Sequence, residues 1–240
     1  MKWIIVTGDS GGLGSAIVKN ILNDGKYGVI GISRSLNENI MNLMKDNQNY
    51  VHINFDLENS LEIRELYKNK IKTLGEIVGL VNNSAMAYDD IITNANVNRI
   101  EKMFSINVYS PMILTKYVIR DMLLHNNKGS IVHISSVSAH TGYKGLSMYA
   151  ATKGALEAFS KNVAREWGVK GIRSNCVAPG FMETTISSSL TNEQRQKIYQ
   201  RTSLKMATDI ESVASMVVFL LSEEAKSITG SIINIDSGTI

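Results

Sequence analysis

Seven short apolar runs, rich in β-branched residues, alternate with longer segments of helical pattern along this chain. Several runs are almost continuously hydrophobic, which is typical of parallel strands covered on both faces. Because alternating strands and helices form right-handed βαβ units, we predict an α/β fold with a doubly wound, seven-stranded parallel sheet and helices on both faces. The predicted strands are 2–7, 27–33, 50–55, 77–82, 130–135, 173–178 and 231–236, and the predicted helices are 13–24, 60–73, 98–124, 148–168 and 209–222.

The chain has the length of one large domain, with no internal repeat, no low-complexity tract and only two prolines among 240 residues. We therefore predict a single domain over residues 1–240. Residues 179–206 are polar and contain no strand pattern, and Thr191 with Gln194 has the pattern of a capping box that opens a short helix. Such an excursion is either a functional lid or a disordered insertion. We favour a substrate lid at about residues 181–206.

Composition excludes several classes of function. The formal net charge is only +3 and the basic residues are scattered, which argues against a nucleic-acid partner. No segment approaches the roughly 18 apolar residues of a membrane span. One cysteine, Cys176, suits a reducing compartment, and without a signal-peptide pattern we predict a cytoplasmic protein. No metal is expected, because the histidines at positions 52, 125, 133 and 140 lack the spacing of metal ligands.

Residues 4–22, IIVTGDSGGLGSAIVKNIL, have the pattern of a strand, a glycine-rich turn and a helix. Gly8, Gly12 and Gly14 allow a tight turn and a close approach of backbone to ligand. Leu13 begins the helix, whose free N–H groups and positive dipole end suit a pyrophosphate. Glycines can serve the turn alone, but their place in the first βαβ unit favours a dinucleotide-binding Rossmann fold.

The end of the second predicted strand, GISRSLNE, bears on the choice of dinucleotide. NAD sites place a carboxylate there, which accepts from the ribose 2′-hydroxyl. This chain has Ser33 and Arg34 instead, and no acid before Glu38. A guanidinium pairs with a 2′-phosphate, so NADP(H) is favoured and NAD(H) stays possible. The alternative is that Arg34 is simply solvated at a strand end.

The segment SMYAATKGAL, residues 147–156, places Tyr149 four residues before Lys153 on one predicted helix face. An ammonium near the phenol favours the phenolate, and lowering a tyrosine pKa by about 3 units requires about 4 kcal/mol. Tyr149 is then a candidate general acid/base. Among nine tyrosines one such pair also arises by chance. Ser136, at the carboxyl end of a predicted strand, strengthens the assignment, because open α/β sheets bind ligands at those ends.

Six motifs, in order, resemble the short-chain dehydrogenase/reductase family: TGDSGGLG (7–14), FDL (55–57), INV (106–108), HISS (133–136), YAATK (149–153) and NCVAPGFMET (175–184). The resemblance covers Trp3 to about Gly238. It implies catalysis by Ser136, Tyr149 and Lys153, with Asn107 holding a proton-relay water, and it selects Ser136 over Ser135, which more simply packs or caps. The cofactor contacts predicted from the turn, the strand ends and the resemblance are Gly8, Ser10, Gly12, Leu13, Gly14, Ser33, Arg34, Asp56, Leu57, Asn83, Ser84, Ala85, Tyr149, Lys153, Pro179, Gly180, Met182 and Thr184.

Two motifs depart from the family pattern. VNNSAMA has Ala85 where glycine is usual, and its methyl restricts the approach of the backbone to the cofactor. The C-terminal NIDSGTI has one glycine where two are common. That region often lies at a subunit interface, so the implied homo-oligomer, a tetramer or dimer, has weaker support.

Within the family, the pattern is closest to the 3-oxoacyl-acyl-carrier-protein reductases, through PGFMETT and EEAKSITGSIINIDSG. We therefore predict reduction of a small-molecule carbonyl substrate, with an acyl group on acyl carrier protein favoured and Lys128 and Lys170 as candidate contacts to that acidic partner. His140 and Tyr143 are candidate substrate contacts, or a solvent-facing pair. The alternatives are a sugar or polyol dehydrogenase and, from another class, a dinucleotide sensor without turnover.

Overall fold

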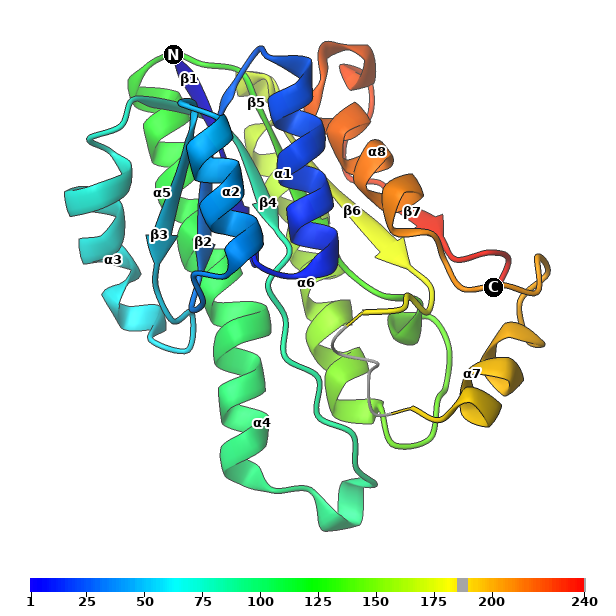
Figure 1. The fold of residues 1–240 in the computed structure, drawn as a ribbon. Helices are drawn as coiled ribbons and strands as arrows, with labels where there is room; N and C mark the ends of the chain where they lie inside the picture. The colour runs from blue at the N-terminus through cyan, green and yellow to red at the C-terminus, as the bar shows by residue number, and fades with distance from the viewer. Residues whose placement is uncertain (185–189, 240) are drawn as a thin grey trace.

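The computed structural model describes residues 1–184 and 190–239. It contains one parallel sheet in the order β3-β2-β1-β4-β5-β6-β7, which confirms the predicted doubly wound fold (Figure 1). The register is parallel throughout, with Ile5 of β1 opposite Ile30 of β2 and Leu80 of β4. The strands are β1 (Lys2–Thr7), β2 (Gly28–Ser33), β3 (Tyr50–Asn54), β4 (Glu76–Asn82), β5 (Gly129–Ile134), β6 (Ile172–Pro179) and β7 (Ile232–Ile235).

The helices cover both faces of the sheet (Figure 1). One hydrophobic cluster joins the sheet to the helices α1, α2 and α8, and another joins it to α3, α5 and α6. The α-helices are α1 (Gly12–Asp24), α2 (Glu38–Asp46), α3 (Ile63–Leu66), α4 (Val97–Phe104), α5 (Ser110–Leu124), α6 (Ser147–Trp167), α7 (Asn192–Tyr199) and α8 (Ile210–Leu221). Two π-helical turns, Tyr67–Ile71 and Ser105–Tyr109, continue α3 and α4.

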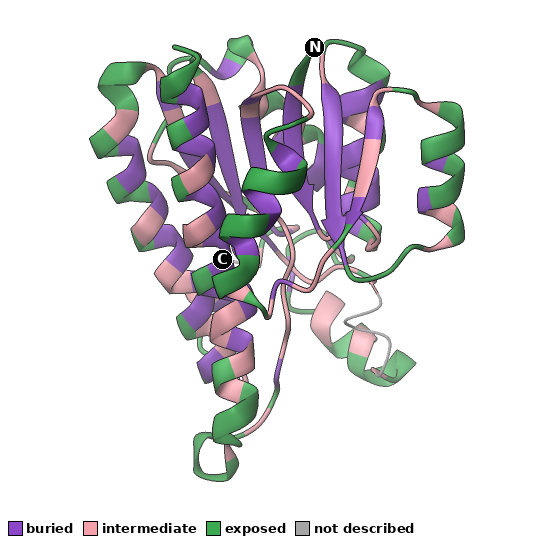
Figure 2. Cartoon of the chain, turned by 90° about the vertical axis from the view of Figure 1, so that its left-hand side faces the viewer, coloured by how far each residue is buried: buried purple, intermediate pink, exposed green. Residues whose placement is uncertain are grey.

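The central strands are buried on both sides, and exposed residues lie on the outer faces of the helices (Figure 2). This explains the continuous apolar runs, because a strand covered on both faces has no solvent side to alternate with. Among the described residues, no helix is long and apolar enough to cross a membrane, and no three His, Cys, Asp or Glu side chains gather as metal ligands.

Helix α2 was not predicted. It begins after Asn37, whose side chain accepts from Ile40 N, and it buries only Ile40 and Leu43. The predicted capping box at Thr191 and Gln194 is confirmed and opens α7.

Candidate active site

A crevice of about 400 Å³ lies at the carboxyl ends of the strands β1 to β6. All the residues predicted to contact the cofactor line it, together with Ser136. The sheet thus collects segments from position 8 to position 184 at one edge. Lining residues that the sequence did not indicate are Gly11, Ser35, Phe55, Met86, Lys102, Ile106, Ile134 and Ser135.

The glycine-rich turn has no room for side chains. Gly8 has a φ of +72°, and a Cβ on Gly14 would lie 2.0 Å from the carbonyl oxygen of Gly8. Helix α1 starts at this turn with no side-chain cap and no acid in its first turn. Its N-terminal N–H groups are therefore available to a ligand, and the turn fits a pyrophosphate group.

Asn83 clamps this turn to the end of β4. Its amide nitrogen Nδ2 donates to the carbonyl oxygen of Thr7 at 2.8 Å and to that of Gly8 at 3.3 Å. Its backbone N–H donates to Thr7 Oγ1 at 3.0 Å. Asn83 lines the crevice as predicted, but its amide nitrogen is committed to the turn, which makes it a positioning residue for the phosphate end.

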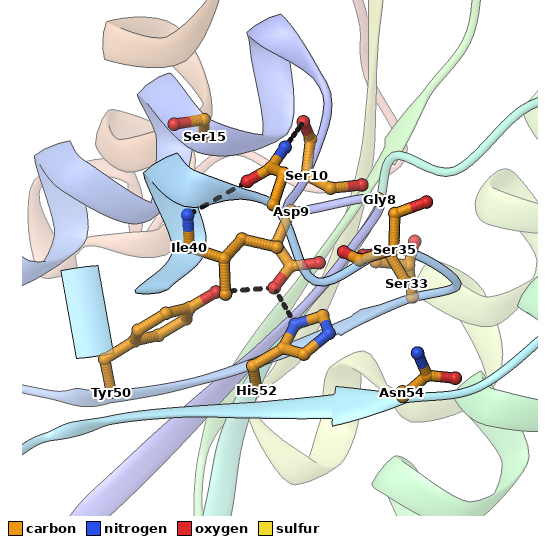
Figure 3. A network of polar contacts seen from close by, with 12 residues as sticks. Gly8, Asp9, Ser10, Ser15, Ser33, Ser35, Ile40, Tyr50, His52 and Asn54 are labelled. Atoms are coloured by element: carbon orange, nitrogen blue, oxygen red, sulfur yellow. Dashed lines mark hydrogen bonds and ion pairs between the residues drawn. The ribbon is translucent and has the colours of Figure 1, made fainter. Parts of the chain in front are cut away.

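A buried carboxylate beneath the turn was missed by the sequence analysis. The side chain of Asp9 is completely buried, and its Oδ2 accepts from Tyr50 Oη at 2.6 Å and contacts His52 Nδ1 at 2.7 Å (Figure 3). Gly31 of β2 leaves the space, because a Cβ there would lie 1.8 Å from Asp9 Oδ2. Tyr50 and His52 are two apart on one face of β3, but β2 lies between β3 and the strand that leads to Asp9, so the sequence alone does not bring the three together.

The second strand ends where the adenosine half of a dinucleotide would lie. Arg34 lines the crevice, and its side chain is 63% exposed. Its Nη1 lies 3.9 Å from Asp56 Oδ2, at the edge of ion-pair distance. Ser33 Oγ donates to the carbonyl oxygen of Ser35 at 3.4 Å. The guanidinium is thus held at the rim by a weak contact and is accessible to an anionic ligand.

The predicted catalytic side chains come from two adjacent elements. Ser136 follows β5, and its Oγ accepts from the backbone N–H of Ser138 at 3.2 Å. Tyr149 and Lys153 lie one turn apart near the start of α6, with Lys153 Nζ 5.5 Å from the centre of the Tyr149 ring. All three line the crevice, and Ser136 forms a side-chain hydrogen bond with Tyr149. One hydroxyl, one phenol and one amine therefore face the same cavity as the glycine-rich turn.

The electrostatics of Tyr149 differ from the prediction. Burial raises the pKa of its phenol to about 12, the hydrogen bond with Ser136 lowers that pKa, and the charge of Asp89 raises it again. The largest effect on this pKa is thus desolvation of the phenolate and not the neighbouring ammonium that the sequence led us to expect, and the influence of a bound oxidised nicotinamide stays a prediction. Tyr149 is consequently protonated at neutral pH, which is the form that donates a proton.

Among residues 1–184 and 190–239, Lys153 has the largest fully buried side chain, with 1% exposure. Its Nζ donates to the carbonyl oxygen of Ile134 at 2.8 Å. Burial lowers the pKa of the ammonium to about 8, and the charges of Cys176 and Glu157 raise it. The carbonyl of β5 thus fixes the amine beneath the crevice, at a cost in desolvation.

The desolvation of the Lys153 ammonium makes the free energy of unfolding depend on pH. Between pH 8 and about 10.5 the folded chain has lost the Lys153 proton while the unfolded chain keeps it, so folding is favoured as pH rises through that window. We expect the free energy of unfolding of the wild type to gain about 3 kcal/mol relative to Lys153→Met from pH 7 to 10.5. Chemical denaturation across that range checks this, with the exposed Lys161→Met as control. A constant difference between wild type and Lys153→Met would contradict it.

Asn107 does not line the crevice. It is buried in the π-turn Ser105–Tyr109, and its amide bridges Met86 N and O at 2.8 and 2.9 Å. Its Nδ2 also donates to Thr152 Oγ1 at 3.1 Å. Asn107 thus ties the loop after β4 to the catalytic helix α6, and its role in holding a proton-relay water stays a prediction.

The predicted substrate contacts His140 and Tyr143 are also absent from the lining of the crevice in the described residues. His140 Nε2 lies 2.9 Å from Glu157 Oε2, and Ser135 Oγ donates to Glu157 Oε1 at 2.5 Å. Glu157 thus anchors both the strand end before Ser136 and the loop after it to α6. The proximity of Ser135 to Glu157 agrees with the structural role expected for this serine.

The predicted lid contributes to the crevice through Met182 and Thr184, and its helix α7 follows at Asn192–Tyr199. Residues 185–189 of the predicted lid lie outside the described part of the chain. Lys128 and Lys170 are not near the crevice, because they precede the amino ends of β5 and β6, at the opposite edge of the sheet.

A sequence profile described as enoyl-(acyl carrier protein) reductase matches residues 8–239. The 3-oxoacyl-[acyl-carrier-protein] reductase FabG of Buchnera aphidicola subsp. Baizongia pistaciae is 32% identical over 238 residues, which cover 99% of this chain and 96% of that relative. The protein of the same name from Salmonella typhimurium is 33% identical over 239 residues, with 99% and 96% coverage.

Among solved structures, a 4-hydroxyisoleucine dehydrogenase complexed with NADH matches with a TM-score of 0.93 and 27% identity, covering 100% of this chain and 98% of that chain. A putative 2-deoxy-d-gluconate 3-dehydrogenase from Agrobacterium tumefaciens with bound NADP matches with a TM-score of 0.89, 24% identity, and coverage of 99% and 96%. The second likeness supports the fold.

Proposed function

We propose that this chain, which belongs to the short-chain dehydrogenase/reductase family and is an NAD(P)-dependent oxidoreductase, reduces a carbonyl group to a secondary alcohol and favours NADP(H). The observation that supports this most is the common crevice: Ser136, Tyr149 and Lys153 line the same cavity as the glycine-rich turn. A 3-oxoacyl thioester is the favoured substrate, in line with the names of the relatives.

In this proposal Ser136 and Tyr149 act on the carbonyl oxygen. The reduced nicotinamide, when bound, supplies a hydride to the carbonyl carbon. Tyr149, protonated at neutral pH, donates its proton to the oxygen, so that carbon and oxygen receive hydride and proton in one reduction. Ser136 donates a hydrogen bond to the same oxygen as negative charge develops there. Lys153 Nζ, fixed by the carbonyl of Ile134, places a cation beside the phenol, and this cation stabilises the phenolate that Tyr149 becomes once its proton has left.

The proposed preference for NADP(H) depends on Arg34. We expect Arg34→Asp to shift the ratio of kcat/KM for NADPH to that for NADH by at least about tenfold towards NADH, because a carboxylate repels a 2′-phosphate and accepts from a 2′-hydroxyl. Steady-state kinetics with both cofactors measure the ratio. Lys45→Asp, an equal change of charge at an exposed site outside the crevice, is the control. An unchanged ratio in Arg34→Asp would remove Arg34 from the 2′-phosphate site.

The second candidate is a dehydrogenase of a sugar, a polyol or another small hydroxyl compound, working with either cofactor. The likeness to the 4-hydroxyisoleucine dehydrogenase bound to NADH favours it. A panel of 3-oxoacyl thioesters, keto-sugars and small ketones, each tested with NADPH and NADH, separates the two. A third outcome, tight cofactor binding with no oxidation by any carbonyl, would favour the dinucleotide sensor and overturn the proposed activity.

The remaining parts of the proposal concern assembly. We propose a single catalytic domain whose segment 181–206 acts as a substrate lid, in a homo-oligomer, either a tetramer or a dimer, of the cytoplasm. An acyl carrier protein is the proposed macromolecular partner if the substrate is a thioester. Lys128 and Lys170 give that docking little support, since they lie at the sheet edge opposite the crevice.

A further inference from the structure

A second cleft, of about 500 Å³, lies on the flank of the molecule between α5 and the segment formed by α3 and the π-turn Tyr67–Ile71. It shares no lining residue with the crevice. Asp121 marks its position, because its Oδ2 accepts from the backbone N–H of Ile77, at the amino end of β4. At Asp121 the cleft is therefore close to the amino ends of the strands, whereas the proposed active site lies at their carboxyl ends.

Five cations line this cleft: Arg64, Lys68 and Lys72 from one helical segment, and Lys116 and Arg120 from the other. None of them forms an ion pair with another described residue. Asp121, the only acid among the described lining residues, is buried and accepts a hydrogen bond from the backbone. Like charges one turn apart repel each other, so the cluster is unfavourable until an anion enters. This stands out in a chain whose net charge is only +3.

A second, independent observation comes from Tyr67, which also lines the cleft. Tyr67 is 4% exposed, and its hydroxyl has no hydrogen-bond partner in the described part of the chain. Its ring stacks on that of Tyr117 with the centres 5.5 Å apart. Buried hydroxyls are almost always hydrogen-bonded. The unpaired hydroxyl of Tyr67 therefore lacks an acceptor, which an anion bound in the cationic cleft would supply. Tyr67 also opens a π-turn, a feature frequent at functional sites.

We propose that this cleft is a second anion site, which binds a phosphate or pyrophosphate group carried by a small molecule. Two guanidiniums and three ammoniums supply the charge, and arginine binds phosphate oxygens in a bidentate manner. In the proposed complex the Tyr67 hydroxyl, which is closed to solvent in the unliganded chain, becomes the donor to one of the anion's oxygens as the ligand enters beside the ring. The volume suits a ligand of nucleotide size, which is large enough to cover the aromatic pair as well as the cations. The shared chemistry is the phosphate, whether free or on a nucleotide.

Isothermal titration calorimetry of the whole protein, saturated with NADPH to fill the crevice, tests this with two probes, inorganic pyrophosphate and ADP. We expect one further binding event per chain for each probe. Tighter binding of ADP would identify a nucleotide as the natural form, and equal binding would identify the phosphate group alone. The double variant Lys68→Glu/Arg120→Glu should abolish the event, and Lys19→Glu/Lys226→Glu, with the same change of charge on other surfaces, should change the affinity less than twofold.

Tyr67→Phe gives the sharper readout, because it removes one oxygen and leaves every charge in place. The affinity for pyrophosphate should fall about tenfold, the loss expected for one hydrogen bond to a charged group. No binding to the wild type, or binding that Tyr67→Phe leaves unchanged, would overturn the site. A loss of equal size in the control double variant would show general charge attraction and would also overturn it. The measurement does not depend on turnover, so it stands if the proposed carbonyl reduction fails.

Discussion

Tyr149→Phe is expected to reduce turnover roughly a hundred- to ten-thousandfold while the affinity for NADPH stays within about threefold of the wild type. The variant loses only the phenolic oxygen, so the ring still fills its place beside Lys153 and Ser136. Without that oxygen the site has lost the group that we propose as the proton donor to the product alkoxide, next to Ser136. Stopped-flow turnover and fluorescence titration with NADPH measure the two quantities separately.

Tyr143→Phe is a matched control for this variant, because Tyr143 lies in the neighbouring loop and does not line the crevice. It should retain turnover within a few-fold of the wild type. Near-normal activity in Tyr149→Phe would remove the proposed mechanism. A parallel loss of NADPH affinity would instead assign Tyr149 to cofactor binding rather than to proton transfer.

Gly14→Ala should abolish measurable dinucleotide binding and destabilise the fold by several kcal/mol. An added Cβ would lie 2.0 Å from the carbonyl oxygen and 2.7 Å from the carbonyl carbon of Gly8, both of them backbone atoms that cannot move aside. The start of α1 must then shift away from β1, which opens the turn that cradles the pyrophosphate. Overpacking of this kind typically costs about 1–3 kcal/mol, and backbone clashes cost more.

Gly154→Ala is the matched control, because Gly154 is also helical and a Cβ there meets nothing within 4 Å. It should stabilise the protein by about 0.5–1 kcal/mol through helix propensity and leave NADPH binding intact. Thermal unfolding with and without NADPH checks both variants. A Gly14→Ala protein of normal stability, with its melting temperature still raised by NADPH, would contradict the close packing of the turn.

The sheet was predictable because its strands are buried on both faces and so appear as apolar runs of distinct length. Helix α2 was missed for the opposite reason: it buries only Ile40 and Leu43, and its clearest signal, the cap at Asn37, is a single side chain. The π-turn that holds Asn107 has no sequence signature, since its residues follow the same apolar pattern as an ordinary helix. The position of Asn107 away from the crevice could not be foreseen.

For the candidate site, too, the sequence predicted some features and not others. Motif spacing identified which segments meet at the strand ends, since the carboxyl ends of parallel strands lie at one edge. It did not show how deeply the phenol of Tyr149 is buried, and desolvation is the largest effect on the pKa of that phenol. Nor did motif spacing reveal the buried carboxylate of Asp9. Its partners are on β3, and they reach it across β2 only because Gly31 has no side chain there.

A crystal structure of the complex with NADPH would show whether Tyr149 and the nicotinamide meet in one crevice, through the distance from the Tyr149 hydroxyl to the nicotinamide ring. We expect the pyrophosphate to lie on the turn between Gly8 and Gly14, and the nicotinamide to face Ser136 and Tyr149. In that complex Lys153 should lie beneath the nicotinamide half. A nucleotide bound elsewhere, or a nicotinamide ring so far from Tyr149 that one substrate carbonyl group cannot reach both, would contradict the proposed reduction.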